Sequence, residues 1–408
     1  MKTRMFFSFL LATLLVWAVC EAQAQVTVNC SSGQTITNAL QSAPMDQPIT
    51  ITVSGTCNEN VVINRDDVTI KGTLVPFGTG GTVNGTDATK ATITVNGART
   101  VISDLTVTGG RRGINVLGSA RIFKCTVENT GPRRLISSGI SFYHGGQGTV
   151  DKCTVRNNRS FGIAIEGGSA TVTDSTISGN TDAGIIVTLG GCARIGLTGD
   201  AEYAGNTIKK NGSNGIMLNA GGSALVGGNT IDSNGTIADH RFGQYGIAIY
   251  QATATLVGKN VISNNNASGI FTRGSAVLIG DPTLGLDSAN VISNNGRSAS
   301  VKGGIVAFLG SSLEIRDATI EGNTGTGVTL STRSTARMSG NTKIKGNTEN
   351  GILLMAGGGL LLPASAMTVT GNTLFGLQCT DGESSFAGTT TGISGNTGGQ
   401  VSSSCTEF

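Results

Sequence analysis

The sequence is poor in aromatic residues, proline, histidine and charge. Of its 408 residues, 4% are aromatic and 13% are charged, and the formal net charge is +3. Nucleic-acid binding normally needs a strong positive field, so this near-neutral composition argues against a nucleic acid as partner. The six prolines stand against 62 glycines, a ratio that fits either a low-complexity chain or a fold that turns constantly. A hydrophobic content of 38%, with regular Ile and Val, favours the second.

The N-terminal segment has the layout of a cleaved export signal. Two basic residues precede an apolar run over residues 5–19, and a small-x-small site ends at Ala24. The run is too short to cross a bilayer comfortably, and no later stretch is long and apolar enough to do so. We therefore predict a signal peptide over residues 1–24 and secretion to the extracellular space or the periplasm. The mature chain then lacks Trp17, the only tryptophan.

A repeat runs along most of the mature chain. A glycine followed by Ile, Val or Leu recurs with shortest steps of 22 to 24 residues. These glycines are Gly113, Gly139, Gly162, Gly184, Gly215, Gly246, Gly269, Gly304, Gly327, Gly351 and Gly376. In seven repeats an asparagine stands four residues earlier: Asn158, Asn180, Asn211, Asn265, Asn323, Asn347 and Asn372. Asparagine tolerates left-handed turns and can bond its neighbour, and glycine permits sharp corners, so we interpret both as structural.

The alternation within each repeat predicts strands. Each unit holds three runs of 3 to 5 residues in which apolar and polar side chains alternate, which is the periodicity of a strand. One coil of this length cannot enclose a core, but coils stacked in register bury one continuous column of apolar side chains. The predicted fold is therefore all-β, a parallel β-helix of about a dozen three-strand coils.

Segments such as Asn229–Asn234 and Asn290–Asn295 carry this repeat in its clearest form. Over roughly residues 50–400 the chain resembles the right-handed parallel β-helix proteins of the pectin lyase-like superfamily, of the bacterial secreted type. The resemblance implies a right-handed coil. It does not specify an activity.

The two ends are predicted to close the coil. Helical spacing of Ile36, Ala39, Leu40 and Ala43 predicts a short helix over residues 35–43 that covers the first coil. We divide the mature chain into an N-terminal cap with the first coil over 25–60, the β-helix over 61–378, and a C-terminal cap over 379–408. Such caps blunt sheet edges that would otherwise template aggregation.

The cysteines are spaced by about one repeat. Neighbouring pairs lie 26 to 28 residues apart, which predicts three disulfides: Cys30 with Cys57, Cys125 with Cys153, and Cys379 with Cys405. Each would contribute about 3 kcal/mol if unstrained. Cys192 is left over, and we expect a buried unpaired thiol because no histidine or second cysteine is near it in sequence.

Three insertions interrupt the repeat at one corner, immediately before the Gly-Ile strand. They lie within 129–139, 234–246 and 295–304. Loops raised beside a flat strand face form a wall, and a wall beside a face forms a groove. The first two loops are expected to stand roughly 19 Å apart, because neighbouring coils are about 4.8 Å apart.

Polar and aromatic residues are expected to face this groove. The second and fourth residues after each glycine should point outward, and the fourth-position column is polar and aromatic from Tyr143 to Arg273. Tyrosine faces pack on sugar rings, and guanidinium groups pair with carboxylates or sulfates. The predicted polysaccharide-binding residues are Arg133, Arg134, Tyr143, Glu166, Asn219, Asp239, Tyr250 and Arg273.

Catalytic signatures are missing. Glycoside hydrolysis needs two carboxyl groups roughly 5 to 10 Å apart, and the outward column offers only Glu166. The best match to the Asp-Pro-His-Asp pattern of the epimerases that the resemblance includes is Asp239-His240-Arg241, which lacks the proline and the second aspartate. Lyase or epimerase chemistry on uronates needs a base and a cation on the substrate carboxylate. The candidates are His240, Arg241, Tyr250 and Arg273.

No metal or cofactor is predicted. His144 and His240 are the only histidines and should lie four coils apart, which excludes a two-histidine site. The strand face has no aspartate cluster of the kind that holds calcium in pectate lyases, and no Ser-His-Asp arrangement is evident. We therefore predict a monomeric secreted β-helix that binds an extracellular polysaccharide. A uronate lyase or epimerase, and a structural or adhesive surface protein, remain open as alternatives.

Overall fold

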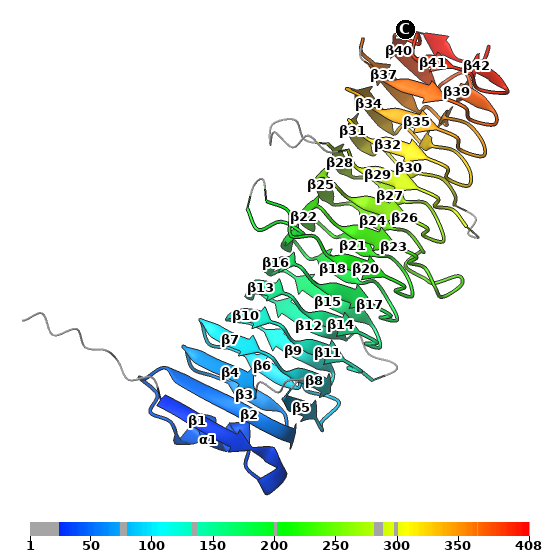
Figure 1. The fold of residues 1–408 in the computed structure, drawn as a ribbon. Helices are drawn as coiled ribbons and strands as arrows, with labels where there is room; N and C mark the ends of the chain where they lie inside the picture. Colours follow the sequence, from blue (N-terminus) through cyan, green and yellow to red (C-terminus); the bar gives the residue numbers. More distant parts are fainter. Residues whose placement is uncertain are drawn as a thin grey trace, which may run out of the picture.

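The computed structural model describes residues 24–73, 80–132, 137–199, 202–280, 289–297, 301–364 and 366–407. The predicted signal peptide lies outside these residues except for Ala24, which opens the first strand. Arg133 and Arg134 also lie outside them. The described chain winds into a long rod of stacked coils that begins beside helix α1 (Ile36–Ser42) (Figure 1).

Each regular coil contributes one strand to each of three sheets, named A, B and C here. Sheet A contains β1 (Ala24–Asn29), β2 (Ile49–Asn58), β4 (Val68–Gly72), β7 (Thr100–Ser103), β10 (Ser119–Phe123), β13 (Gln147–Asp151), β16 (Ser169–Thr173), β19 (Cys192–Ile195), β22 (Ser223–Gly227), β25 (Thr253–Gly258), β28 (Ala276–Ile279), β31 (Ser312–Arg316), β34 (Thr335–Ser339), β37 (Gly359–Leu362), β40 (Ser385–Gly388) and β43 (Thr406–Glu407).

Sheet B begins with the second half of β2 and is continuous with sheet A through that strand. It continues with β5 (Gly81–Gly85), β8 (Thr106–Gly109), β11 (Thr126–Glu128), β14 (Thr154–Arg156), β17 (Thr176–Ser178), β20 (Thr207–Lys209), β23 (Thr230–Asp232), β26 (Val261–Ser263), β29 (Val291–Ser293), β32 (Thr319–Glu321), β35 (Lys343–Lys345), β38 (Thr368–Thr370) and β41 (Ile393–Ser394).

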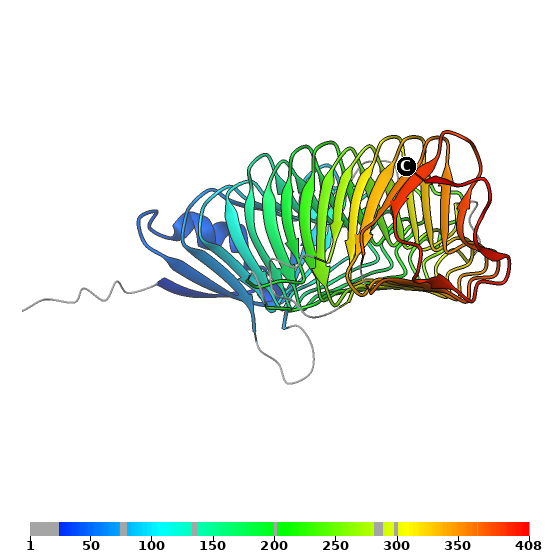
Figure 2. The same cartoon turned by 90° about the horizontal axis from the view of Figure 1, so that it is seen from above.

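Sheet C holds the Gly-Ile strands. It contains β3 (Val61–Ile63), β6 (Ile93–Val95), β9 (Arg112–Val116), β12 (Ser138–Tyr143), β15 (Phe161–Glu166), β18 (Ile185–Thr188), β21 (Ile216–Asn219), β24 (Ile247–Tyr250), β27 (Ile270–Arg273), β30 (Ile305–Phe308), β33 (Val328–Ser331), β36 (Ile352–Met355), β39 (Phe375–Cys379) and β42 (Gly399–Val401). Its strands pair in parallel, each with the equivalent strand of the next coil (Figure 2).

The parallel β-helix is therefore confirmed, but the count of about a dozen coils is too low. Sheet C alone has 14 strands in the described part of the chain. The first two, β3 and β6, follow Asn60 and Thr92 in place of the repeat glycine. The Gly-Ile motif therefore could not identify these two strands.

The interior is dry and apolar along its whole length. Inward side chains of sheet C such as Ile163, Ile165 and Val187 are fully buried, as the alternation predicted. A ladder of buried asparagines runs beside them. In this ladder the Nδ2 of Asn180 donates to the Oδ1 of Asn211 at 3.0 Å, and the backbone N–H of Asn180 donates to the same oxygen at 3.1 Å.

The ladder confirms that the asparagines bond their neighbours in adjacent coils. The structure differs from the prediction in which residue takes the left-handed turn and in why the repeat needs glycine. Positive φ falls one residue before the ladder position, as at Asn157 (54°) and Lys210 (54°). At Gly162 a Cβ would lie 2.7 Å from the Nδ2 of Asn180 and 2.6 Å from a backbone carbonyl. The repeat therefore needs glycine for close packing against the ladder.

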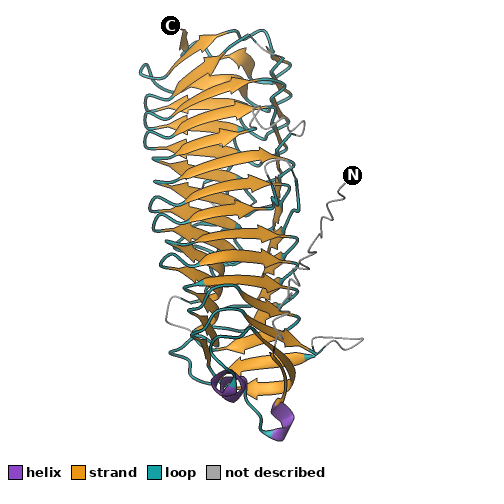
Figure 3. Cartoon of the chain, turned by 90° about the vertical axis from the view of Figure 1, so that its left-hand side faces the viewer, coloured by secondary structure: helices purple, strands orange, loops and turns teal. Residues whose placement is uncertain are grey.

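The predicted capping helix is α1, which lies at the first end of the rod (Figure 3). Thr35 caps it by accepting from the N–H of Asn38 at 3.1 Å, and the Glu59 carboxylate accepts from the N–H of Ile36 at 2.7 Å. A 3₁₀ turn, η1 (Cys30–Ser32), precedes it. The Cys30–Cys57 disulfide ties this end and Cys379–Cys405 ties the other, as predicted.

The third predicted disulfide is absent. Cys125 and Cys153 are free buried thiols at the same corner of neighbouring coils. The N–H of Cys125 donates to the Sγ of Cys153 at 3.4 Å, and the N–H of Cys153 donates in turn to Ser175. The two thiols thus occupy a ladder that asparagines continue farther along the rod. The contact between them and their burial raise the pKa of Cys125.

The expectation of a buried thiol at Cys192 is also wrong. Its side chain is exposed because it occupies the outward first position of β19, in register with Ser169 and Ser223. Among the described residues, no helix has the length and apolar character needed to span a bilayer. Disulfides are typical of proteins that mature in an oxidising compartment, in keeping with secretion.

Candidate functional site

The outer face of sheet C is open near its first coils and covered farther on. One outward column runs in register through Val62, Thr94, Asn115, Ser141, Ala164, Ile186, Met217, Ala248, Phe271, Val306 and Thr329. Val62 is 47% exposed, whereas Ser141 and Ala248 are 0% exposed. The predicted groove along the middle of this face is therefore filled by protein.

The insertion between β23 and β24 covers the middle of the face. Its Phe242 packs on a cluster that includes Phe161, with ring centroids 5.9 Å apart. Its Tyr245 stacks on Phe271, with centroids 4.5 Å apart and ring planes within 14°. These rings bury apolar outward residues that would otherwise face water, so the loop acts as a cover where a free-standing wall was predicted.

A charged hydrogen-bond chain holds this covering loop to the coils. The Nε2 of His240 lies 2.9 Å from one oxygen of Asp182, and the hydroxyl of Ser160 donates to the other oxygen at 2.5 Å. Burial alone would raise the pKa of Asp182, but the bonds from His240 and Ser160 and the charges of His240 and Arg241 outweigh it and lower that pKa. The sequence pattern does not reveal this chain of contacts, because a long stretch of sequence separates His240 from Ser160 and Asp182.

This chain is not a nucleophilic triad. Both Ser160 and His240 bind the carboxylate of Asp182, so the aspartate lies in the middle. A hydrolytic triad needs the histidine between the other two groups, where it can take the hydroxyl proton. The arrangement instead suits a buried anchor that satisfies three polar groups beneath the covering loop.

The four proposed catalytic residues do not converge. His240 is bound to Asp182 just before β18, and Arg241 lies over the Phe242 ring at 4.4 Å. Tyr250 and Arg273 are register neighbours at the C-terminal ends of β24 and β27. Burial, together with nearby Tyr245, raises the pKa of Tyr250 despite the opposing charge of Arg273, so its phenol is a poor base at neutral pH.

The remaining predicted binding residues are distributed along the face. Asn219 and Tyr250 are half-buried neighbours in register, and Arg273 and Asp239 are exposed. Tyr143 and Glu166 are also register partners, at the ends of β12 and β15. The structure therefore places the fourth-position residues in one register column at the C-terminal ends of the sheet C strands, and Tyr250 of this column packs against the clusters beneath the covering loop.

Arg112 organises the pair formed by Tyr143 and Glu166. Its guanidinium carbon lies 4.8 Å from the centre of the Tyr143 ring, and its Nη2 lies 3.1 Å from the Oε2 of Glu166. Ser141 donates to the same oxygen at 3.3 Å. The Arg112 and Glu166 side chains are each 15% exposed. The pair therefore marks the border between the open part and the covered part of the outer face of sheet C.

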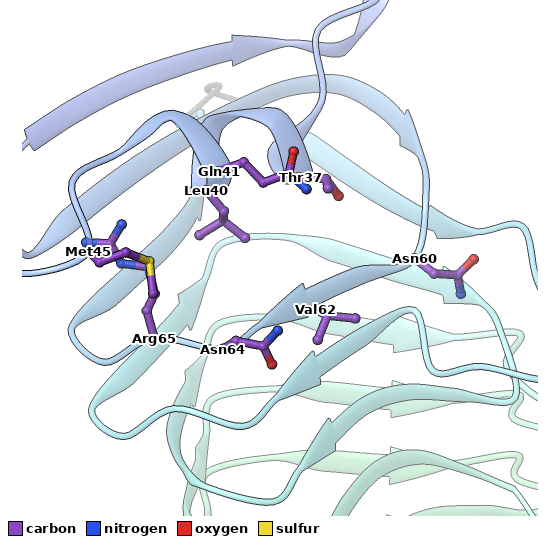
Figure 4. A pocket seen from close by; sticks show the side chains of 8 residues that line it. All are labelled: Thr37, Leu40, Gln41, Met45, Asn60, Val62, Asn64 and Arg65. Carbon is purple, nitrogen blue, oxygen red and sulfur yellow. The ribbon is translucent and has the colours of Figure 1, made fainter.

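Two adjoining cavities lie on the open side of that border. The first, of about 410 Å³, lies between α1 and β3 and is lined by Thr37, Leu40, Gln41, Met45, Asn60, Val62, Asn64 and Arg65 (Figure 4). The second, of about 320 Å³, is lined by Asn60, Val62, Thr89, Lys90, Ala91, Thr94, Arg111, Arg112 and Asn115. They share Asn60 and Val62, and together they form what we call the open groove.

The open groove was missed because two of its three strands, β3 and β6, lack the Gly-Ile motif. A signal was nevertheless present, since Lys90 stands just before β6 and the Arg111-Arg112 pair stands just before the glycine of β9. These cations mark the same corner that carries the later insertions. In the described part of the chain, no cluster of His, Cys, Asp and Glu is large enough to hold a metal ion.

Comparisons with known proteins agree with the coil architecture. A family model described as "Right handed beta helix region" matches residues 49–199, 193–284 and 236–397. A search of curated protein sequences found no match.

Solved structures with similar chains include the A-module of a mannuronan C-5 epimerase from Azotobacter vinelandii, at 15% identity and a TM-score of 0.49 over 82% of this chain and 94% of that one. A pectate lyase is 13% identical with a TM-score of 0.40, over 73% of this chain and 78% of that one. The Dettilon tailspike protein is 12% identical with a TM-score of 0.29, over 88% of this chain and 60% of that one. We draw no activity or substrate from similarities this low.

Proposed function

We propose that this chain, which belongs to the right-handed beta-helix family, binds an acidic polysaccharide in the open groove over β3, β6 and β9. One observation carries the proposal. The residues lining the two cavities include the four cations Arg65, Lys90, Arg111 and Arg112 and no carboxylate. A concave surface with one sign of charge favours ligands of the opposite sign.

Two of these four cations have acidic partners. Lys90 pairs with Asp87 at 3.3 Å, but the two side chains are 69% and 39% exposed, and such exposed pairs are weak. Glu166 offsets Arg112 from the covered side of the border. Arg65 is held in place because its guanidinium donates to the backbone carbonyls of Ala43, Pro44 and Gln47.

The neutral lining residues fit a sugar chain. Asn64 and Asn115 carry amide groups, which can donate to and accept from hydroxyl groups, whereas the amide of Asn60 is already bonded to the backbone of Asp87 and Ala91. The outward residues Val62, Thr94 and Asn115 follow one another at about 4.8 Å along the axis, which gives the groove a direction. Guanidinium groups bind carboxylates or sulfates with two parallel bonds, so uronates and sulfated sugars are the expected ligand class.

Calorimetry with size-defined oligouronates tests the proposal. Replacing Lys90 and Arg111 by alanine should weaken binding about three- to tenfold and reduce its salt dependence, because two charge contacts are removed. The matched control replaces Lys343 and Lys345 on β35, which are exposed and lie in sheet B near the far end of the rod.

Equal loss in both double variants, or no binding of any acidic oligosaccharide by the parent protein, would refute the proposal. The same samples report on the alternative of a uronate lyase through the absorbance of unsaturated products. Growth of that absorbance would replace simple binding by cleavage.

A further inference from the structure

The two cavities of the open groove differ in chemistry. The second cavity has Lys90, Arg111 and Arg112 in its lining. The first cavity has Leu40, Met45 and Val62, with Arg65 as its one cation. Figure 4 shows Leu40 projecting from α1 toward β3, the strand that carries Val62. The groove is therefore apolar at its α1 end and cationic one coil farther along.

The apolar end is a surface that water reaches. Met45 is 70% exposed and Val62 is 47% exposed, whereas Leu40 is 7% exposed at the base of the cavity. Exposed apolar side chains gathered in a hollow commonly mark a ligand site, and a volume of about 410 Å³ lies in the range of small-molecule pockets. Arg65 contributes its charge here and few free donors, because it is 5% exposed and its guanidinium already donates to three backbone carbonyls.

We infer that the ligand is an acidic saccharide that carries an acyl substituent, with the acyl chain in the first cavity and the anionic sugar in the second. This inference rests on the proposed function and specifies the ligand of the same groove. The change from Val62 to Thr94 occurs over one coil step of about 4.8 Å, so the apolar and charged parts of the ligand must be directly linked.

The acyl part should contribute through burial. Each methylene removed from water is expected to tighten binding about fourfold, until the cavity is filled. A neutral acyl glycoside should gain binding affinity from contacts in the first cavity alone. An unsubstituted acidic oligosaccharide should gain affinity from contacts in the second cavity alone. The acylated acidic ligand should therefore bind more tightly than either.

Calorimetry with four probes tests this inference: an oligouronate, its octanoyl ester, neutral octanoyl glucoside, and octanoate. The exposed residue Met45, which lines the first cavity and not the second, is replaced as M45S, with the exposed Leu361→Ser on β37 as the control. In the parent protein the octanoyl group should improve oligouronate binding at least tenfold. The M45S variant should lose much of that gain and keep its affinity for the unsubstituted oligouronate, while the control keeps both. Circular dichroism checks that every variant is folded.

The outcomes separate the two proposals. If the octanoyl group gives no gain in affinity, or if the gain is unchanged in the M45S variant, the acyl site is overturned while acidic-sugar binding stays intact. Octanoyl glucoside binding as tightly as the acylated oligouronate, with no effect of Lys90→Ala and Arg111→Ala, would overturn the acidic ligand and with it the proposed function. Octanoate binding alone, with no contribution from sugar, would overturn both.

Discussion

At the scale of single residues, the most consequential contact is between Asp182 and His240. It joins a coil of the rod to a loop that is far away in sequence, and both side chains are about 10% exposed. When one member of a buried charged pair is removed, the other member stays buried without its hydrogen bonds and without an opposite charge beside it. The covering loop and the aromatic rings beneath it therefore depend on one carboxylate.

Asp182→Asn should destabilise the protein by about 2 kcal/mol at neutral pH, because the buried charge and its ionic bonds are lost. The pKa of Asp182 is lowered from 3.8 in the folded protein. The stabilisation it gives is thus present above that pH and is lost as the pH falls through the lower folded pKa. Urea unfolding of parent and variant at neutral pH and at about pH 3 should show the difference shrinking in acid.

Asp239→Asn is the matched control for this substitution. Asp239 is exposed, lies on the same loop beside His240, and has a φ of 50° that asparagine also tolerates. Its replacement should change the free energy of unfolding by less than about 0.5 kcal/mol. If the two variants have the same stability at neutral pH, the anchoring role of Asp182 is wrong.

At the scale of elements, the asparagine ladder defines each corner between sheets B and C. The Nδ2 of Asn211 donates to Asn234 at 2.9 Å and to the carbonyl of Ile177 at 3.2 Å, and its Oδ1 accepts two bonds from Asn180. A side chain that satisfies groups on both neighbouring coils couples three coils. The ladder therefore transmits any break to adjacent repeats.

Asn211→Ala should lower the free energy of unfolding by about 3 kcal/mol, because buried donors and acceptors in two neighbouring coils lose their partners. Lys209→Ala, two residues earlier on the exposed side of β20, should have little effect. Thermal unfolding by circular dichroism compares the two. Equal melting temperatures would contradict the structural importance of the ladder.

The strands and their register were predictable from the sequence, and the state of their outer face was not. Alternation assigns a side chain such as Ile186 to the outside of a coil, but it cannot say what covers that side chain. The covering residues Phe242 and Tyr245 come from an insertion whose conformation no repeat specifies. Their apolar rings were the available signal, and a loop meant to stand in water would not need them.

The cysteines show the same limit. Spacing of one repeat identifies residues that lie side by side in neighbouring coils, and this was enough for Cys30 with Cys57. It does not say whether the sulfur atoms face each other or face an internal ladder, as they do at Cys125 and Cys153. Sequence spacing therefore fixes proximity along the axis, while side-chain direction decides the bond.

At the scale of the whole molecule, the rod offers a ligand a short length of open sheet C at its α1 end. The outward column is accessible at Val62 and closes at Ser141, which is three coils farther on. A ligand that follows the axis can therefore contact a stretch of roughly 10 to 15 Å before the Arg112–Glu166 pair blocks its path. The sequence alone placed the groove between the first two insertions, a longer stretch in the middle of the rod.

This difference gives a prediction that depends on ligand length. Affinity for acidic oligosaccharides should rise with the first few sugar units and then stay constant, because further units extend past the closed border into water and add no contacts. Calorimetry on a series of size-defined oligouronates measures this dependence, and Arg112→Ala should shift the plateau toward longer chains by opening the border. An affinity that keeps rising along the series in the parent protein would instead place the ligand along the covered middle of the face, as the insertions first suggested. That result would require the loop held by Asp182 to move aside, so Asp182→Asn should then strengthen the binding of long chains and leave short ones unchanged.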